Sequence, residues 1–420
     1  MHSYNAPFKG TPLAKLKSFN GPVTFGLDEL HLLGHGLCKE VLAMAKIVKK
    51  LFVDMEHSLR SIPTTFDGSF RTPNSKHTTR AVDYLAIVTY AIPALFVNEM
   101  VNGEAKHALK SIVKFLQLAQ LRSISDQQLD DMDRYLQAWN DFLQAQVDDN
   151  KYDITVFKPN YHYLQHITAM IRQLGPMYAF STRCLERTIG MYKRKLKSTK
   201  DSGVEAGNVL VSTAATDYAK SMQDEDNADD NEGNDEGIYL DGKTNTIRLS
   251  SASIDQLGID REEVYRTLGA TRNSIIITAT RIFKDGTIYG SKSNTTRSTR
   301  KDYLMVFNTV VNKYALRPRR QPSNVLMFFF GDVLKYIKYD NNYFAVVTLY
   351  QAYFDDDNET YYFRHTQTRT KTTLINANDL LACAGTISNS RSKCSSIFWD
   401  QMVLGQDTSA ANCGNLDYVP

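Results

Sequence analysis

Three side chains that could bind a metal ion lie close together near the start of the sequence. They are Asp28, His31 and His35, spaced three and then four residues apart. On a helix this spacing places the carboxylate and both imidazoles on one face, where they could bind a divalent cation. The alternative is a helix-capping aspartate beside two histidines at a packed or polar surface. That alternative is favoured, because no further ligand is visible in the neighbouring sequence.

A second histidine pair, His162 and His166, is spaced four residues apart and could also share a metal ion. The pair lacks the glutamate of the HExxH motif, so it does not indicate a zinc protease. The same shortage of ligands favours a half-buried pair without metal. The sequence also lacks a P-loop, a dinucleotide-binding glycine pattern and a GxSxG elbow. Its 5 cysteines are few, odd in number and scattered, which argues against a disulfide scaffold. They include no CxxC pair, which argues against a thiolate zinc site.

The most informative stretch, residues 158–198, ends in a dense run of basic side chains. On a helix these cations would form a positive stripe beside Tyr192 that could meet phosphates without reading bases. The alternative is a solvated helix end, where the helix dipole favours cations. The candidate nucleic-acid-binding residues are Arg183, Arg187, Lys193, Arg194, Lys195, Lys197 and Lys200.

A second basic cluster lies in a proline-containing connector further along the chain. It could bind nucleic acid or form part of a nuclear import signal. Its members are Lys313, Arg317, Arg319 and Arg320.

Helical periodicity dominates the first half of the chain. Apolar residues recur at three- and four-residue steps and predict helices over residues 27–47, 81–101, 106–121 and 125–147, with Pro93 as a kink or a break in the second. Acidic Asp28 and Glu29 suit the start of the first helix. Ser125 and Gln128 predict a capping box at the start of the last. A proline- and serine-rich loop is expected over residues 61–79.

The second half of the chain has a different pattern, which predicts an α+β fold. Residues 201–236 are polar and then strongly acidic, so they predict a disordered linker between domains. From residue 237 to 420, segments rich in β-branched and aromatic residues predict strands, with a small β-barrel over 322–403 and a short helix over 253–268. A hairpin loop is expected at residues 339–343. The expected organisation is an irregular N-terminus (1–25), a helical region (26–200), the linker and the strand-rich domain.

Composition sets outer limits on function. The chain has 420 residues, 42% of them hydrophobic, and a formal net charge of only +3. Overall charge therefore does not argue for nucleic acid, and the argument must rest on local patches. No signal peptide and no apolar run long enough for a membrane span is present, so we expect a nuclear or cytoplasmic protein that is not secreted and has no membrane partner.

The block 158–198 resembles the domain that follows the catalytic domain in CACTA (En/Spm) class DNA transposases. The resemblance rests on Lys158-Pro159, on the two histidines of that block, on Gly175-Pro176, on Glu186-Arg187 and on the basic helix. Residues 86–99 are similar to another stretch of the same relatives. Residues 25–36, FGLDELHLLGHG, look like their D-x-x-H segment, and the segment 328–350 is similar to a β module near their C-terminus.

The resemblance implies an RNase H-like catalytic domain in the family, in which three carboxylates hold two metal ions. By motif position, Asp28 corresponds to the last carboxylate. Residues 1–25 cannot supply the sheet that carries the other two. We therefore expect a remnant or domesticated derivative of a transposase with no catalytic activity of its own, DNA as its partner, and no cofactor unless an intact catalytic domain supplies a magnesium site.

Two other functions stay open from the sequence. The strand-rich domain could be an interaction module that binds a peptide or chromatin partner through its aromatic residues, although alternate strand positions face inward and such residues more often form core. The aromatic residues in question are Phe328, Phe329, Phe330, Tyr336, Tyr339 and Tyr343. The third possibility is a metal-dependent nuclease that uses Asp28, His31 and His35, which is disfavoured because a two-metal site needs more carboxylates.

Overall fold

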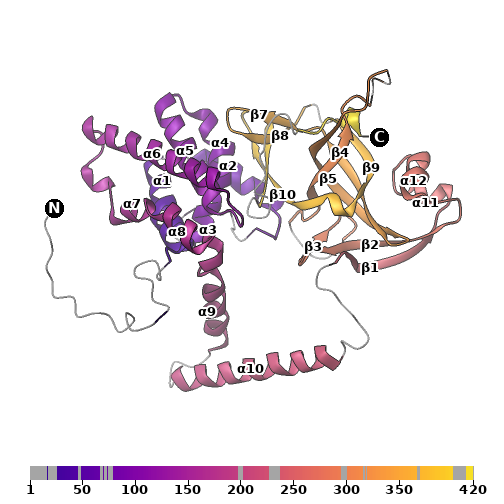
Figure 1. The fold of residues 1–420 in the computed structure, drawn as a ribbon, viewed down its shortest axis with the longest axis horizontal. Helices are drawn as coiled ribbons and strands as arrows, with labels where there is room; N and C mark the ends of the chain where they lie inside the picture. Colours follow the sequence, from indigo (N-terminus) through magenta and orange to yellow (C-terminus); the bar gives the residue numbers. More distant parts are fainter. Residues whose placement is uncertain are drawn as a thin grey trace. The chain divides into compact units, whose positions relative to one another are not determined.

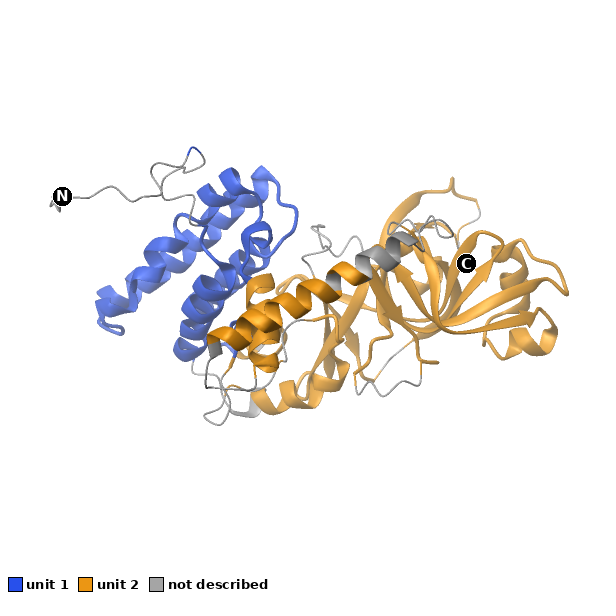
Figure 2. Ribbon diagram, turned by 90° about the horizontal axis from the view of Figure 1, so that it is seen from below, with its two compact units in different colours: residues 1–46, 80–89, 100–182 blue, residues 47–79, 90–99, 183–420 orange. Residues whose placement is uncertain are grey.

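The computed structural model divides the chain into two compact units that are interleaved in sequence (Figures 1 and 2). Unit 1 contains residues 1–46, 80–89 and 100–182, and unit 2 contains residues 47–79, 90–99 and 183–420. The described residues are 17, 26–45, 49–66, 70, 73, 79–196, 202–226, 237–294, 300–315, 317, 319–366, 369–400 and 413–419. This division differs from the predicted helical region 26–200, because two early segments and residues 183–200 cluster with the later part of the chain.

Unit 1 is helical, and its longest helices form because their apolar residues fall on one face. In α6 (Asp126–Asp148) the buried residues Leu129, Met132, Leu136, Trp139 and Leu143 recur at three- and four-residue steps. This helix packs against α5 (Gly103–Ala119). The remaining helices of unit 1 are a π-helix (Glu29–Cys38), α1 (Lys39–Met44), α3 (Ala81–Ala86), α7 (Pro159–Leu164) and α8 (Ile167–Leu174).

The helix starts that the sequence predicted are confirmed. Asp28 caps the π-helix, and its carboxylate accepts a hydrogen bond from the His31 amide at 2.9 Å. Ser125 and Gln128 form the predicted capping box, with reciprocal bonds of 3.3 and 2.8 Å. Helix interiors differ more: the first predicted helix contains the π-helix. The second runs without a gap from α3 through another π-helix (Ile87–Ala91) into α4 (Ile92–Leu95), and Pro93 lies in the first turn of α4.

Unit 2 contains an antiparallel sheet of eleven strands, which confirms the α+β class. The main strand order is β1-β2-β5-β4-β10-β11-β8-β7, with β3 beside β2, β6 beside β5, and β9 beside β6. The strands are β1 (Tyr239–Arg248), β2 (Ile275–Lys284), β3 (Thr287–Gly290), β4 (Leu304–Asn312), β5 (Asn324–Tyr339), β6 (Asn342–Tyr350), β7 (Tyr353–Asp355), β8 (Thr360–Arg364), β9 (Thr370–Asn376), β10 (Leu380–Asn389) and β11 (Cys394–Trp399).

The strands predicted as a module over 322–403 belong to this larger sheet. The reason is β5, which is 16 residues long and pairs with β2 and β4 as well as with β6. The pairing with β2 joins residues far apart in sequence, such as Ile277 and Lys338, so local patterns do not predict it. The hairpin between β5 and β6 is as predicted: Tyr339 pairs with Asn342, and Asp340 takes a left-handed conformation (φ 54°) in the tight turn.

Both faces of the sheet are covered. One face buries a core that includes Phe307, Phe329 and Tyr336. The other packs against α11 (Ser251–Asp255) and α12 (Arg261–Leu268), which replace the single helix predicted over 253–268. The buried Glu263 of α12 accepts hydrogen bonds from the Thr373 hydroxyl and from the Leu374 amide, the latter at 3.2 Å.

Besides α9 (Arg183–Lys195), three further α-helices of the described residues belong to unit 2. Two of them, α2 (Lys49–Ser58) and α4, pack against β10. The third, α10 (Ser202–Asp226), occupies most of the stretch that the sequence predicted as a disordered linker. Its residues before 223 carry few acids and several alanines, which favour a helix. Residues 227–236, the rest of the predicted linker, lie outside the described residues.

Candidate nucleic-acid interface

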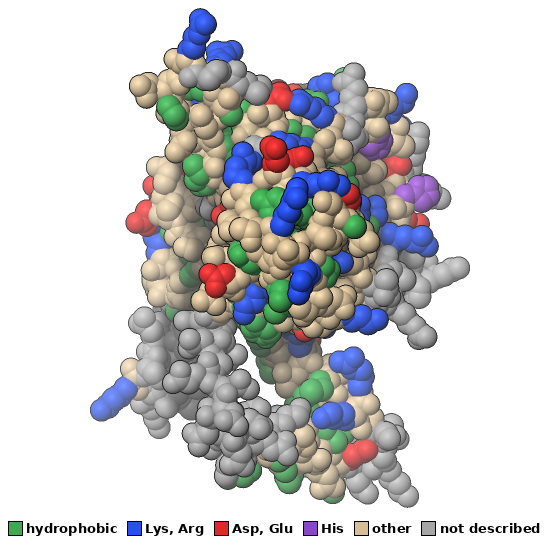
Figure 3. Space-filling model, turned by 90° about the vertical axis from the view of Figure 1, so that its right-hand side faces the viewer, with side chains coloured by type: hydrophobic (Ala, Val, Ile, Leu, Met, Phe, Trp, Pro, Cys, Tyr) green, Lys and Arg blue, Asp and Glu red, His purple; other side chains and the backbone are tan. Residues whose placement is uncertain are grey.

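Lys and Arg side chains are spread over the face of the molecule drawn in Figure 3, with Asp and Glu among them. This agrees with a net charge of only +3. A nucleic-acid interface must therefore be a local cluster in which cations outnumber acids and have no carboxylate partners.

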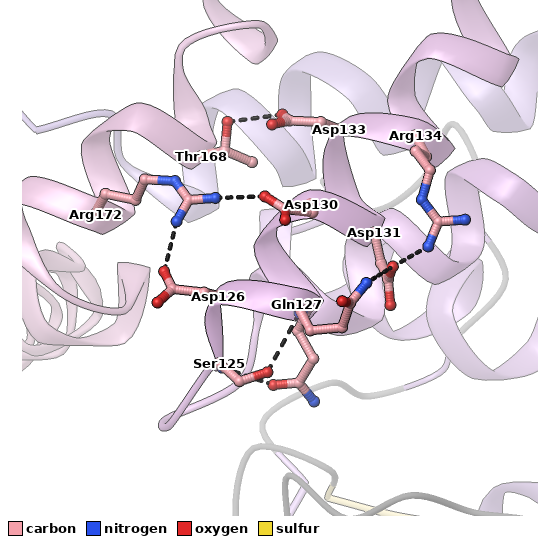
Figure 4. Close-up of polar contacts among 10 residues, drawn as sticks. Ser125, Asp126, Gln127, Asp130, Asp131, Asp133, Arg134, Thr168 and Arg172 are labelled. Atoms are coloured by element: carbon pink, nitrogen blue, oxygen red, sulfur yellow. Dashed lines mark hydrogen bonds and ion pairs between the residues drawn. The ribbon is translucent and has the colours of Figure 1, made fainter.

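The block 158–198 is divided between the two units, and side chains in its first half form polar contacts within unit 1. Arg172 of α8 reaches Asp126 and Asp130 of α6 at 2.5 and 2.7 Å, and the Thr168 hydroxyl donates to Asp133 at 2.7 Å (Figure 4). Gly175 ends α8 with a φ of 85°, a conformation that favours glycine, and so explains the Gly-Pro break. Arg172 therefore links α8 to α6.

The second half forms α9 (Arg183–Lys195) in unit 2. Arg183 is buried at its start, whereas Arg187, Lys193, Arg194 and Lys195 are exposed. The predicted contacts Lys197 and Lys200 lie outside the described residues. The structure therefore brings four of the seven candidate cations to the surface of one helix.

The exposed cations of α9 are Arg187, Lys193, Arg194 and Lys195, and we call this group the collar because its members point in several directions around the helix. The single stripe that the sequence predicted contains only part of them. Successive helical residues are turned by about 100°, so Lys193, Arg194 and Lys195 point in three directions. Arg183, Arg187 and Arg194, four and seven residues apart, share one face. Tyr192 is about 160° away from Arg194 by the same geometry, so it is not beside the arginines.

Backbone and side-chain contacts hold part of the collar close to the helix. The Nε atoms of Arg187 and Arg194 lie 3.4 and 3.2 Å from the carbonyl oxygens of Arg183 and Gly190. Lys195 donates to the Thr213 hydroxyl of α10 at 2.9 Å. These contacts leave the remaining guanidinium N–H groups of both arginines, and the Lys193 ammonium, for other ligands. Glu186 in the first turn is the only acid in α9.

Asp28 and its two histidines form a capping arrangement. The Asp28 carboxylate accepts bonds from the His31 amide, from His31 Nδ1 at 2.5 Å and from the Thr182 amide at 2.8 Å. Burial acts to raise the pKa of Asp28, but the bonds from Thr182 and His31 outweigh it and the pKa is lowered. His35 stacks edge-on with Tyr84, and burial together with His31 and Lys39 lowers its pKa.

The second histidine pair is close enough to share a ligand. His162 Nε2 and His166 Nε2 are 3.3 Å apart on an exposed turn. Within the described part of the chain, however, no group of three or more His, Cys, Asp and Glu side chains is arranged to hold a metal ion.

The aromatic residues of the interaction-module hypothesis lie mostly in the interior. Phe328, Phe329, Phe330 and Tyr336 are each at most 3% exposed, so they form core and cannot line an open surface. This agrees with the expectation that aromatic residues in strands more often form core, because alternate strand positions face inward. Of that set, only Tyr339 and Tyr343 are partly exposed.

Comparison of the chain with protein-family models, with curated proteins and with solved structures finds no match. The helices that the structure describes include none with the length and apolar character needed to cross a bilayer.

Proposed function

We propose that this chain binds nucleic acid through sequence-independent contacts between the exposed cations of α9 and backbone phosphates. The observation that carries the proposal is the collar of exposed cations on α9. Arg187, Lys193, Arg194 and Lys195 are exposed, and residues 187–200 contain no acid. Cations that are not neutralised by neighbouring carboxylates can displace counterions from a phosphate backbone, which favours binding at low salt.

The resemblance of residues 158–198 to transposases supports DNA as the nucleic acid. It also supports descent from a transposase, with a role in binding DNA and not in cutting it. The position that the resemblance assigns to a catalytic carboxylate is Asp28, whose oxygens already accept bonds from His31 and Thr182. A carboxylate with these bonds serves as a helix cap, so we assign it a structural role.

The proposal is tested by titrating a labelled DNA duplex with the protein between about 50 and about 200 mM salt. The variant K193Q/R194Q/K195Q removes three exposed cations while keeping good helix formers. We expect weaker binding, and a slope of log affinity against log salt that is smaller by about 2 to 3, because each phosphate contact contributes roughly 0.9.

A matched control removes the same charge elsewhere in unit 2. Lys243, Arg266 and Arg272 are exposed, and K243Q/R266Q/R272Q should leave both affinity and slope close to those of the wild type. No binding by the wild-type protein at low salt, or equal losses in the two variants, would contradict the assignment to α9.

A further inference from the structure

Strands β4 and β5 extend past their neighbours as a two-stranded ribbon. They pair with each other from Leu304–Asp332 to Asn312–Asn324. On its other edge β4 pairs with β10 only up to Phe307, and β5 pairs with β6 only from Phe330 onward. Apart from a single bridge between Phe328 and Cys413, the outer residues 309–312 and 324–328 have no further strand partner within the described sheet.

The two faces of this ribbon differ. Val311 and Met327 are 5% and 8% exposed and belong to the core of the sheet. Val310 and Leu326 form a directly opposed pair on the other face and are 59% and 50% exposed. The exposed apolar surface of the ribbon is therefore this pair near the tip, because Phe328, the next residue of β5 on the same face, is 3% exposed and belongs to another buried core.

The loop at the tip of the ribbon is closed at its base and strongly basic. The Asn312 side-chain oxygen accepts bonds from the Tyr314 and Ser323 amides, each at 3.0 Å. Lys313 and Arg320 lie over the Tyr314 ring at 5.3 and 5.1 Å from its centroid. Figure 3 shows Lys and Arg side chains at the projection at the top of the molecule. Between residues 312 and 324 the sequence has four cations, Lys313, Arg317, Arg319 and Arg320, and no acid.

Two of these cations contact the same ring. A cation over an aromatic ring is attracted by the ring's negative face, and Tyr314 serves two cations at once. The bond from Arg320 and the charge of Lys313 lower the pKa of Tyr314, which reflects the positive potential at the tip. Arg317 and Arg319 are exposed beside them. Arginine presents a planar fork of donors that matches phosphate oxygens.

We propose that the β4–β5 ribbon is a second nucleic-acid contact, which binds duplex DNA with its tip cations on phosphates and its exposed face in a groove. The major groove is wide enough for a two-stranded β-ribbon, and apolar side chains on such a ribbon can meet thymine methyl groups. The inference rests on the proposed function in that the partner is the same. It adds a site on a different element, so the two can fail separately.

The first test compares R317Q/R319Q/R320Q with the α9 variant K193Q/R194Q/K195Q in the same duplex titration. We expect the ribbon variant to lose roughly one to two orders of magnitude in affinity at low salt, and its salt slope to fall by about 2 to 3. Combining both triple variants should reduce the slope further. K243Q/R266Q/R272Q again serves as the equal-charge control.

A second variant tests the groove contact without changing charge. V310T/L326T places threonine, a β-branched residue favoured in strands, at both exposed positions and removes apolar surface. We expect weaker duplex binding with an unchanged salt slope, because no phosphate contact is lost.

The outcomes separate the two proposals. If the α9 variant weakens binding and the ribbon variants behave as the control does, the ribbon inference is overturned and the proposed function stands. If the wild-type protein does not bind duplex at low salt, both are overturned. Binding of the tip to vesicles of anionic and neutral phospholipid that is lost in R317Q/R319Q/R320Q, without any such effect on duplex binding, would assign the tip to lipid phosphates and overturn the inference.

Discussion

At the residue scale, Asp28 shows how local sequence can predict position without predicting role. Its spacing from His31 and His35 suggested a ligand set, and its place before an apolar run suggested a cap. The structure has the cap, because three donors converge on the carboxylate. The helix it begins is a π-helix, whose i to i+5 bonding the 3.6-residue period does not predict.

The role of Asp28 leads to a pH-dependent prediction. Asp28→Ala should destabilise unit 1 by about 1 kcal/mol at neutral pH, the usual cost of losing a helix cap, and Asp28→Asn should cost less because asparagine also caps. Because the pKa of Asp28 is lowered in the folded protein, its charge stabilises the fold above the unfolded pKa of about 3.9. That part of the stability is lost as the pH falls through the folded pKa.

Urea unfolding followed by tryptophan fluorescence measures this effect. The chain has two tryptophans, Trp139 in unit 1 and Trp399 in unit 2, so a Trp399→Phe background leaves Trp139 as the reporter of unit 1. A stability difference between wild type and Asp28→Asn that stays constant from pH 7 to about pH 3 would show that the charge of Asp28 contributes nothing.

At the element scale, elements defined by neighbouring residues were predicted and those defined by distant pairing were not. The capping box of α6 and the β5–β6 turn depend on residues within a few positions of one another. By contrast, β5 pairs with the distant strand β2, where Lys338 lies opposite Ile277, and α12 is fixed to β9 through Glu263. The sequence predicted a connector at the basic cluster around Arg319. The structure places this cluster at the tip between the paired strands β4 and β5, and the strand-like patterns on both sides of it were the signal for such a tip.

The contact between α12 and β9 gives a prediction at this scale. Glu263→Ala should destabilise the α11–α12 region by about 1 to 3 kcal/mol, because the Thr373 hydroxyl and the Leu374 amide lose their buried acceptor. Glu263→Gln keeps an acceptor oxygen and should cost less. Hydrogen exchange of the amides in residues 251–268 and 370–376 measures the effect, and protection that is equal in the two variants would contradict it.

At the scale of the whole molecule, the chain crosses between its units several times. Segments from residues 47–99 supply one border of unit 2. Asp54 accepts hydrogen bonds from the Ser390 amide and hydroxyl, and the Ser58 hydroxyl accepts one from the Ser388 amide. The rings of Phe66 and Tyr90 lie 5.3 and 5.0 Å from that of Phe398. A boundary drawn at the acidic stretch, as the sequence suggested, would cut these contacts.

This arrangement predicts that residues 237–420 produced alone will be less stable than the same residues in the full chain. The fragment would leave Phe398 and the β10–β11 border uncovered, and it should bind a dye for exposed apolar surface. In a Trp139→Phe background, Trp399 reports the unfolding of unit 2 in the full chain and in the fragment alike. Equal urea midpoints for the two proteins would show that the early segments are dispensable.

The interleaving also bears on how the protein is made. Tyr90 leaves the ribosome roughly 300 residues before Phe398 does. At typical synthesis rates of about 5–20 residues per second, Phe66, Phe70 and Tyr90 wait on the order of 15 to 60 s for their ring partner. Throughout that interval these aromatic side chains are apolar surface without its ring partner, and this part of unit 2 can be completed only after Phe398 has been synthesised.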